Sequence, residues 1–297
     1  MLTVGNRIMK KFSIITVCFN CENVIRDTIV SLLNQTCTDY EYLIQDGASN
    51  DRTVKVAESF ISAFAEKGIP YRIISQKDGG IYDAMNKAIR EAQGEWFLFM
   101  NAGDILADND VLKTVKESGK LEIADIVYGD TIDKNRDWYI YNRAAPLNTI
   151  DESMPFCHQS VFAKGQLHKS SPYSTEYLIN SDYLFYYQQY QDGKTFAYIP
   201  KPFSVFDRSG GISSNAVLSA QERLKIQEER PVRNEALIQK RRNLLKRYKR
   251  VEFIYHYFYR YLPEKIRLKR RDAIREKQGW KHKEEFFEEY MKKQEKE

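Results

Sequence analysis

The chain has 297 residues, 42% of them hydrophobic and 29% charged, which is enough to bury one large core with an appendage, or two domains. No run approaches the roughly 18 consecutive apolar residues of a transmembrane helix, and the amino terminus lacks the apolar segment of a signal peptide. The cysteines supply one CxxC pair, Cys18 and Cys21, without a second pair, which disfavours a zinc or disulfide framework. These features predict a cytoplasmic protein.

The formal net charge of +5 is unevenly distributed along the chain. Residues 233–297 hold 21 Lys and Arg against 11 Asp and Glu, which leaves 25 basic and 30 acidic residues in the first 232. A mildly acidic body with a basic tail indicates an anionic partner for the tail, either a membrane surface or nucleic acid.

Short apolar runs alternate with helical patterns through the first hundred residues. The expected strands lie within 12–20, 40–44, 71–75 and 96–100, and the expected helices begin near 24, 53 and 81, the second running to about 65. The first run is apolar and β-branched almost throughout, as in a parallel strand that is buried on both faces. This alternation predicts an α/β fold, an αβα sandwich with a mostly parallel central sheet.

The pattern becomes less regular after residue 125. Strands are expected at 126–130 and 196–206, a helix from 181 to about 191, and a flexible glycine-rich loop at 209–214. Further on, a helical stripe of apolar residues continues to Pro263, which ends it; its members are Leu244, Tyr248, Val251, Tyr255, Phe258 and Leu262.

Polar residues follow each of the first four expected strands. They are Asn20, Asp46, Asp78 and the segment from Asn101 to Asp104. Because ligands of such sheets bind at the carboxyl ends of the strands, this edge is the predicted site. The competing interpretation is that Asp, Asn and Gly are simply the residues that turns favour.

Several segments together closely resemble family 2 glycosyltransferases. They read IITVCFN at 14–20, QDGASNDRT at 45–53, QKDGGIYDAMNK at 76–87 and FLFMNAGD at 97–104, with CHQ at 157–159, NSDY at 180–183 and GGIS at 210–213 downstream. The resemblance covers about residues 10–215 and is strongest to the bacterial members that build capsular, O-antigen and exopolysaccharide repeat units.

The resemblance implies a GT-A catalytic domain over 10–230, followed by a basic, aromatic, helical tail over 231–297. It also implies an inverting transfer from a nucleotide sugar with a divalent cation, Mn²⁺ or Mg²⁺. Asp104 matches the metal-binding carboxylate of the family's DxD-type motif, and Asn101 replaces its usual first Asp. The metal would then have one fewer charged protein ligand.

The remaining site residues are carried over from the same motifs. Asp46 matches the carboxylate that accepts a hydrogen bond from uracil, and Asp182 matches the base that takes the proton of the acceptor hydroxyl. The others are Thr16 and Asn20 beside the nucleoside, Lys77, Asp78, Asn86 and Asn101 on the donor side, His158 and Gln159 on the acceptor or diphosphate side, and Gly210 and Gly211 in a loop that closes over the donor.

Two other classes of function remain open at this point. A nucleotidyltransferase also has a nucleotide-binding sheet, but the segment after the first strand has neither glycine nor a basic residue, and a catalytically degenerate nucleotide-sugar-binding protein would share every motif. A nucleic-acid binder would need cations where the body places carboxylates, so we expect no nucleic-acid partner.

The tail leaves two interpretations. Its basic amphipathic helix suits the anionic inner face of the plasma membrane, where polyprenyl-linked acceptors would be found. Alternatively, the helix packs on the catalytic domain and its basic face is solvated.

Overall fold

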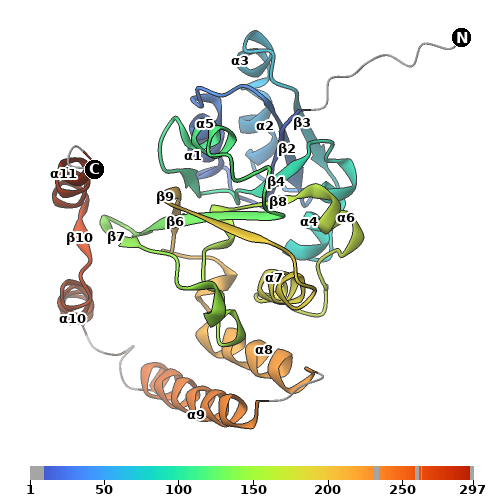
Figure 1. The fold of residues 1–297 in the computed structure, drawn as a ribbon. Helices are drawn as coiled ribbons and strands as arrows, with labels where there is room; N and C mark the ends of the chain where they lie inside the picture. The colour runs from blue at the N-terminus through green and yellow to red at the C-terminus, as the bar shows by residue number, and fades with distance from the viewer. Residues whose placement is uncertain (1–9, 231–233, 258–260, 262, 295–297) are drawn as a thin grey trace, which may run out of the picture. The chain divides into compact units, whose positions relative to one another are not determined.

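The computed structural model describes residues 10–230, 234–257, 261 and 263–294 (Figure 1). They divide into two compact units: the first comprises the described residues up to Thr131 together with Arg143–Phe206, and the second comprises Ile132–Asn142 and the described residues from Asp207 onward. The expected division into a catalytic domain and a tail near residue 230 remains a prediction about function.

The first unit is an α/β domain built on one sheet. Its strands are β1 (Phe12–Cys18), β2 (Tyr40–Asp46), β3 (Tyr71–Ser75), β4 (Trp96–Phe99), β5 (Ile105–Leu106), β6 (Ile126–Asn135), β8 (Val161–Lys164) and β9 (Phe196–Asp207), of which β6 and β9 extend into the second unit. Its helices are α1 (Ile25–Leu33), α2 (Thr53–Glu58), α3 (Ile61–Glu66), α4 (Ile81–Glu91), α5 (Val111–Glu117), α6 (Gly165–Ser170) and α7 (Ser181–Gln191), with 3-10 turns η1 (Leu147–Asp151) and η2 (His158–Ser160).

The order of strands across this sheet is β6-β8-β4-β1-β2-β3, and β9 pairs with β5 and β6. The four strands β4, β1, β2 and β3 are parallel, whereas β8 is antiparallel to both of its neighbours. The predicted α/β class with a mixed, mostly parallel central sheet is confirmed.

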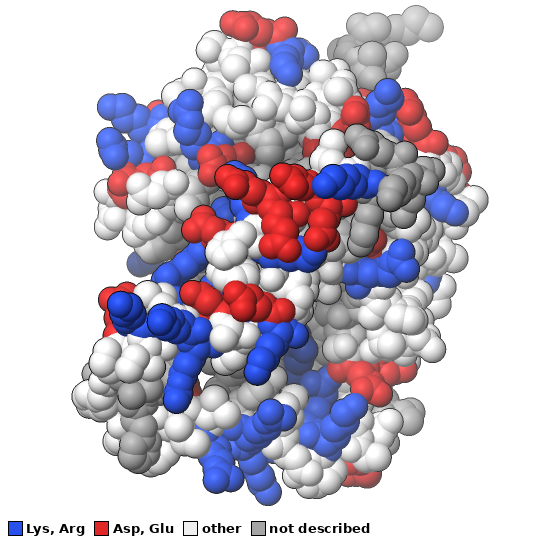
Figure 2. Space-filling model, turned by 90° about the vertical axis from the view of Figure 1, so that its left-hand side faces the viewer, with Lys and Arg blue, Asp and Glu red and all other residues white. Residues whose placement is uncertain are grey.

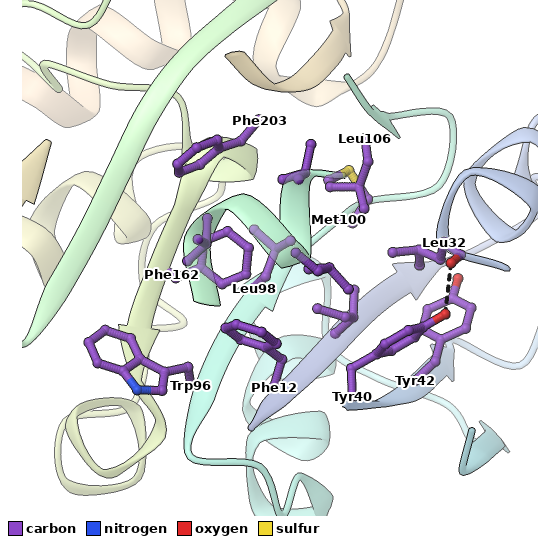
Figure 3. Close-up of a cluster of buried hydrophobic side chains, with 14 of the residues drawn as sticks. Phe12, Leu32, Tyr40, Tyr42, Trp96, Leu98, Met100, Leu106, Phe162 and Phe203 are labelled. Atoms are coloured by element: carbon purple, nitrogen blue, oxygen red, sulfur yellow. Dashed lines mark hydrogen bonds between the residues drawn. The ribbon is translucent and has the colours of Figure 1, made fainter. Parts of the chain in front are cut away.

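Side chains of the central strands alternate between two cores. Phe12 on β1 lies in register with Tyr40 on β2 and with Trp96 on β4, and all three belong to one apolar cluster (Figure 3). Helices α1, α2, α3 and α5 contribute to that cluster, and the Tyr40 hydroxyl donates to the Leu32 carbonyl of α1 at 2.7 Å. Helix α4 contacts β1 and β2, while its own buried side chains lie outside the cluster, so it covers the other face. Burial on both faces explains why these strands are apolar throughout.

The single helix expected over 53–65 is wrong, because the structure has α2 and α3 separated at Ser59 and Phe60. The Ser59 hydroxyl donates to the Val56 carbonyl at 2.6 Å and so competes with the helical backbone. Phe60 is buried at this break.

The second unit consists of β7 (Trp138–Asn142), β10 (Lys281–His282), η3 (Ile212–Ser214) and the helices α8 (Ala216–Glu228), α9 (Glu235–Tyr257), α10 (Glu264–Lys277) and α11 (Lys283–Gln294). Strand β10 pairs with β7 in antiparallel fashion, and α8 packs against α9. The buried ring of Phe286 on α11 stacks with Tyr139 of β7 at 5.8 Å between centroids. The carboxyl-terminal helices are therefore present, and α11 buries an aromatic side chain.

Two helices of this unit are strongly basic. Lys and Arg make up seven of the 23 residues of α9 and seven of the 14 residues of α10. Figure 2 shows Lys and Arg side chains gathered on the lower part of the face that it presents. In the predicted apolar stripe, Leu244 and Tyr248 are half-buried, Val251 and Tyr255 are exposed, and Phe258 and Leu262 lie outside the described residues.

The amino-terminal edge of the first unit's sheet is organised by a buried carboxylate. Glu41, only 4% exposed, accepts hydrogen bonds from the Ser13 hydroxyl at 2.6 Å, from the backbone N–H groups of Gln93 and Gly94 at 2.5 and 3.1 Å, and from Arg72 at 3.2 Å. A Cβ atom on Gly94 would lie 2.5 Å from the Ser13 backbone nitrogen, so only glycine fits there. Four chain segments thus depend on one side chain.

We predict that Glu41→Ala lowers the free energy of unfolding by about 3 kcal/mol, because it leaves buried donors without an acceptor. Glu91→Ala is the matched control, since Glu91 pairs with the same Arg72 at 3.6 Å but is half-exposed. That control is expected to cost less than about 1 kcal/mol. Urea unfolding measures both values, and equal losses in the two variants would contradict the assignment.

Candidate active site

Strand register places three polar chain positions side by side at the carboxyl edge. Cys18 at the end of β1 pairs with Asp46 at the end of β2, and Asp46 pairs with Ser75 at the end of β3. The fully buried Asp46 carboxylate accepts from the Ser75 hydroxyl at 2.6 Å, and from the Ser49 hydroxyl and N–H at 2.5 and 2.9 Å. The carboxylate predicted to bind uracil is therefore buried and already accepts these three hydrogen bonds within the fold, and its contact with a base stays a prediction.

The loop after β1 is joined to the loop after β2. Asn20 adopts the left-handed conformation with φ of 50°, which Asn tolerates better than most residues. Its side-chain oxygen accepts from the Asn50 N–H at 3.0 Å, and its own N–H donates to the Ser49 hydroxyl at 2.8 Å. Asn20 therefore lies at the predicted edge and fixes the geometry of both loops.

The loop after β3 lies against the loop after β2, where Asp78 approaches Gly47. One oxygen of Asp78 accepts from the Gly80 N–H at 2.9 Å, and the other would lie 2.6 Å from a Cβ atom on Gly47. The Phe19 ring would lie 3.4 Å from that same Cβ, and the Phe19 side chain is 61% exposed. A carboxylate and an exposed aromatic ring therefore flank a glycine. The neighbouring Lys77 is exposed, and its carbonyl accepts from the Lys87 side chain at 2.7 Å.

Two predicted donor residues make hydrogen bonds within the fold. The buried Thr16 hydroxyl donates to the Met100 carbonyl at 2.6 Å and lies 2.9 Å from the Tyr42 hydroxyl. The Asn86 amide makes two hydrogen bonds to the backbone of Tyr173, at 2.8 and 2.9 Å. Both therefore support loops, and whether either touches a donor stays a prediction.

Asn101 and Asp104 lie on one turn after β4. The Asp104 N–H donates to the Asn101 carbonyl at 3.0 Å, which closes the turn. The Asn101 side-chain oxygen is buried, and no group in the described part of the chain hydrogen-bonds to it. The buried Asp104 carboxylate accepts from the Gln159 amide at 3.0 Å. The predicted metal residue and the predicted Gln159 are thus in direct contact.

Asp182 lies in the first turn of α7, where the helix dipole favours a carboxylate. One oxygen accepts from the Tyr183 N–H at 2.8 Å and from the Tyr82 hydroxyl at 3.0 Å. The other lies 3.9 Å from Nδ1 of His158. The structure therefore brings the predicted base next to His158, while Gln159 joins this pair to Asp104.

Comparison with known proteins identifies the family. The model of glycosyl transferase family 2 matches residues 13–209. The chain belongs to glycosyl transferase family 2. It is therefore a glycosyltransferase that uses a nucleotide-sugar donor.

Three relatives illustrate this membership. A PGL/p-HBAD biosynthesis glycosyltransferase of Mycobacterium tuberculosis is 31% identical over 209 residues, which are 69% of this chain and 80% of that protein. The structure of S. aureus TarS 1-349 in complex with UDP-GlcNAc superposes with a TM-score of 0.59 at 17% identity, covering 83% of this chain and 73% of that 1-349 chain. The mannosyltransferase PcManGT from Pyrobaculum calidifontis, solved with GDP-Man and Mn²⁺, gives a TM-score of 0.59 at 15% identity, covering 80% of this chain and 70% of that one. These structures share the fold.

Gly210 and Gly211, predicted to close over the donor of this family 2 enzyme, lie in the second unit. Both are exposed, and a Cβ atom on either would meet nothing within 4 Å. Gly211 has φ of 85°, a conformation that glycine adopts without strain. The pair precedes η3, so part of the expected loop is a short turn.

The sequence analysis did not identify two residues, Phe19 and Tyr82, that the structure brings to the candidate site. Phe19 directly follows a buried strand, where a polar turn residue is usual. A large apolar residue at such a position was the feature of the sequence that could have identified it. Tyr82 carries no such signal, because an aromatic residue in the first turn of α4 is equally expected to fill a core. Its contact with Asp182 spans 100 residues and appears only in the folded chain.

No helix among the described residues has the combination of length and apolar character that crossing a membrane requires.

A second histidine, His168, packs against Phe185 of α7. His168 is fully buried, stacked between Phe97 and Phe185 at 5.9 and 4.3 Å between centroids, and no described group hydrogen-bonds to its nitrogens. Burial, with a smaller contribution from His158, lowers the pKa of His168 to about 3. Burial also lowers the pKa of His158, although Asp182 opposes that shift. Both rings are therefore neutral at pH 7.

The His168 shift predicts an acid-sensitive domain. A neutral folded state and an unfolded state that binds a proton below about pH 6.5 mean that stability falls as the pH drops below that value. Between pH 7.5 and pH 5, His168→Phe should therefore lose about 2 kcal/mol less than the wild type in urea unfolding. His282→Gln, at an exposed histidine, should retain the wild-type dependence. An identical pH dependence in wild type and His168→Phe would refute this explanation.

Proposed function

We propose that this family 2 enzyme inverts the anomeric centre and transfers a sugar from a UDP-sugar to a hydroxyl of a glycan or lipid-linked oligosaccharide of a surface polysaccharide. The observation that carries the proposal is the convergence of the Asp78 loop, the Asp104 turn and the first turn of α7 with Asp182 at the carboxyl edge of the parallel sheet. TarS, which has this fold, binds UDP-GlcNAc. Family membership removes the nucleotidyltransferase alternative.

The nucleoside end of the donor is assigned to the loops after β1, β2 and β3. The exposed Phe19 ring beside Gly47 offers a flat apolar surface for a base, and the glycine leaves room for its close approach. Asp78 and the exposed Lys77 lie where the ribose and diphosphate would follow. The hydroxyl groups of Ser49 and Ser75, which donate to Asp46, hold this surface in place. Asn20 holds it from the loop after β1 through its hydrogen bonds to Ser49 and Asn50.

The turn after β4 fits a hard divalent cation. Asn101 offers a buried amide oxygen to which none of the described residues donates, and Asp104 offers a buried carboxylate, both of the oxygen type that Mg²⁺ and Mn²⁺ prefer. Within the described residues, no group of three or more His, Cys, Asp or Glu is arranged to hold a metal alone. Donor phosphate oxygens and water would complete the ligand set. When bound, the cation would neutralise charge on the departing diphosphate.

Asp182 is assigned as the base. In an inverting transfer the acceptor hydroxyl attacks the anomeric carbon from the side opposite the leaving group. Its proton passes to the Asp182 carboxylate, the new glycosidic bond forms, and the bond from the anomeric carbon to the diphosphate oxygen breaks. A nucleoside diphosphate leaves. Neutral His158, 3.9 Å from Asp182, forms part of the wall on the acceptor side.

Hydrolysis of a panel of nucleotide sugars with Mn²⁺ or Mg²⁺ tests the reaction. The wild type should release one nucleoside diphosphate in a metal-dependent manner, and Asp104→Ala should lower that rate by at least about a hundredfold. Asn101→Asp should lower the Mn²⁺ concentration needed for half-maximal activity, because it adds a charged ligand.

Asp108→Ala is the matched control, since Asp108 is exposed and lies four residues beyond Asp104. It should keep the wild-type rate. No turnover by the wild type across the panel would instead indicate a degenerate, nucleotide-sugar-binding member of the family. Unchanged activity in Asp104→Ala would remove the metal assignment alone.

The second unit supports a further part of the proposal, attachment to an anionic membrane. The carboxyl-terminal part of α9 exposes apolar side chains, with Val251 and Phe253 each 56% exposed and Ile254 46% exposed. They follow the seven Lys and Arg residues of the same helix. An exposed apolar segment that follows a basic one matches the interface of a bilayer with anionic headgroups, where a lipid-linked acceptor would also lie.

The triple variant Val251→Ser, Phe253→Ser, Ile254→Ser should bind vesicles of phosphatidylglycerol and phosphatidylcholine about tenfold more weakly than the wild type, because three apolar groups are removed from the interface. Cosedimentation measures the binding. Ile61→Ser with Ile123→Ser, two exposed isoleucines of the first unit, is the control. Equal binding by the triple variant and the control, or stronger binding to duplex DNA than to vesicles, would overturn this part of the proposal.

A further inference from the structure

Tyr82 joins the donor side of the first unit to the proposed base. It is the second residue of α4, two residues beyond Gly80, and is 6% exposed. Its hydroxyl lies 2.5 Å from the Ile179 carbonyl oxygen and 3.0 Å from Oδ1 of Asp182. The hydroxyl has a single proton for these two acceptors, so it bridges the segment before α7 and the first turn of α7.

The two oxygens of Asp182 are consequently unlike one another. Oδ1 receives the Tyr82 hydroxyl and the Tyr183 N–H. Oδ2 has no hydrogen-bond donor among the described residues, and Nδ1 of His158 lies 3.9 Å away from it. The Asp182 side chain is 22% exposed, so a substrate hydroxyl can reach it.

We propose that Tyr82 is a positioning residue that binds Oδ1 of Asp182 and thereby presents Oδ2 to the acceptor hydroxyl. This inference rests on the proposed function, because it assigns a role relative to Asp182 as the base. A carboxylate that turns freely about its side-chain bond offers either oxygen in many orientations. Two donors on one oxygen remove that freedom before the acceptor arrives.

The assignment is consistent with the balance of the reaction. The acceptor O–H bond breaks, its proton binds Oδ2, and the acceptor oxygen bonds to the anomeric carbon as the diphosphate leaves. Oδ1 then remains the carbonyl-like oxygen of a neutral carboxylic acid, which still accepts from Tyr82 and from the Tyr183 N–H. The same contacts therefore serve Asp182 before and after proton transfer, and no other side chain has to move.

Helix α4 also fixes the surroundings of this contact. The Tyr82 ring packs on the Tyr173 ring at 5.5 Å between centroids, and Asn86 of the same helix holds the Tyr173 backbone through two hydrogen bonds. Because α4 begins directly after the Lys77–Gly80 loop on the donor side, one rigid helix connects that loop to the base. Asn86 thus supports the site through the Tyr173 backbone.

The experiment compares Tyr82→Phe, Asp182→Asn and the double variant in Mn²⁺-dependent hydrolysis of the nucleotide sugar that the wild type turns over fastest, where water is the acceptor. Tyr82→Phe should lower kcat about tenfold and leave the donor KM within about twofold, because the ring and the donor loop stay in place. In the Asp182→Asn background the same substitution should have no further effect, since Tyr82 acts through Asp182.

Tyr40→Phe is the matched control, because it also removes one buried tyrosine hydroxyl bonded to a backbone carbonyl, that of Leu32. It should keep the wild-type kcat. UDP binding with Mn²⁺, measured by calorimetry, checks that each variant is folded and retains its donor site.

The outcomes separate the inference from the proposed function. A wild-type kcat in Tyr82→Phe, or an equal fold-loss in the wild-type and Asp182→Asn backgrounds, overturns the positioning role and leaves the proposed function intact. A wild-type kcat in Asp182→Asn overturns the base assignment, and the role of Tyr82 with it. Loss of kcat in Tyr82→Phe that disappears in the Asp182→Asn background supports both.

Discussion

Burial of the Asp46 carboxylate is the constraint on which the catalytic edge depends. A buried carboxyl group needs hydrogen-bond partners, and here the donors come from the loop after β2 and from the end of β3. Parallel register decides which ends meet, because it aligns Cys18, Asp46 and Ser75 across three strands. Asn20 then extends the network to the loop after β1. The loops that would receive a nucleotide are therefore held by polar contacts that need no ligand.

Much of this arrangement could be predicted because it is local. Buried strands are apolar throughout, their ends are polar, and the motifs of the family fall at those ends, so the α/β class and the predicted edge followed from the sequence. What could not be predicted arises from individual side-chain hydrogen bonds. The Ser59 hydroxyl ends a helix that propensity would continue, and the Asn86 amide bonds to the backbone of Tyr173, 87 residues further along the chain. Periodicity contains no information about either partner.

The second unit shows the same limit in a different form. The helix that carries Leu244 and Tyr248 was predictable from spacing, yet the membership of the unit was not, since the segment Ile132–Asn142 joins residues more than 60 positions later. Antiparallel pairing of β10 with β7 and packing of Phe286 on Tyr139 bring these segments together. The basic helices α9 and α10 therefore belong to a compact unit that also contains the segment Ile132–Asn142.

Gly94 has a consequence for how this fold can change. A side chain there would collide with the backbone of Ser13, and its N–H belongs to the Glu41 network, so the turn before β4 can neither enlarge nor accept another residue easily. The amino-terminal edge of the sheet is therefore the more constrained of the two edges. The opposite edge ends in hydroxyl and amide contacts between loops, which can be rebuilt one loop at a time. Grafting donor-side loops from relatives with other sugar preferences should therefore preserve strand register, making specificity a separable property of this scaffold.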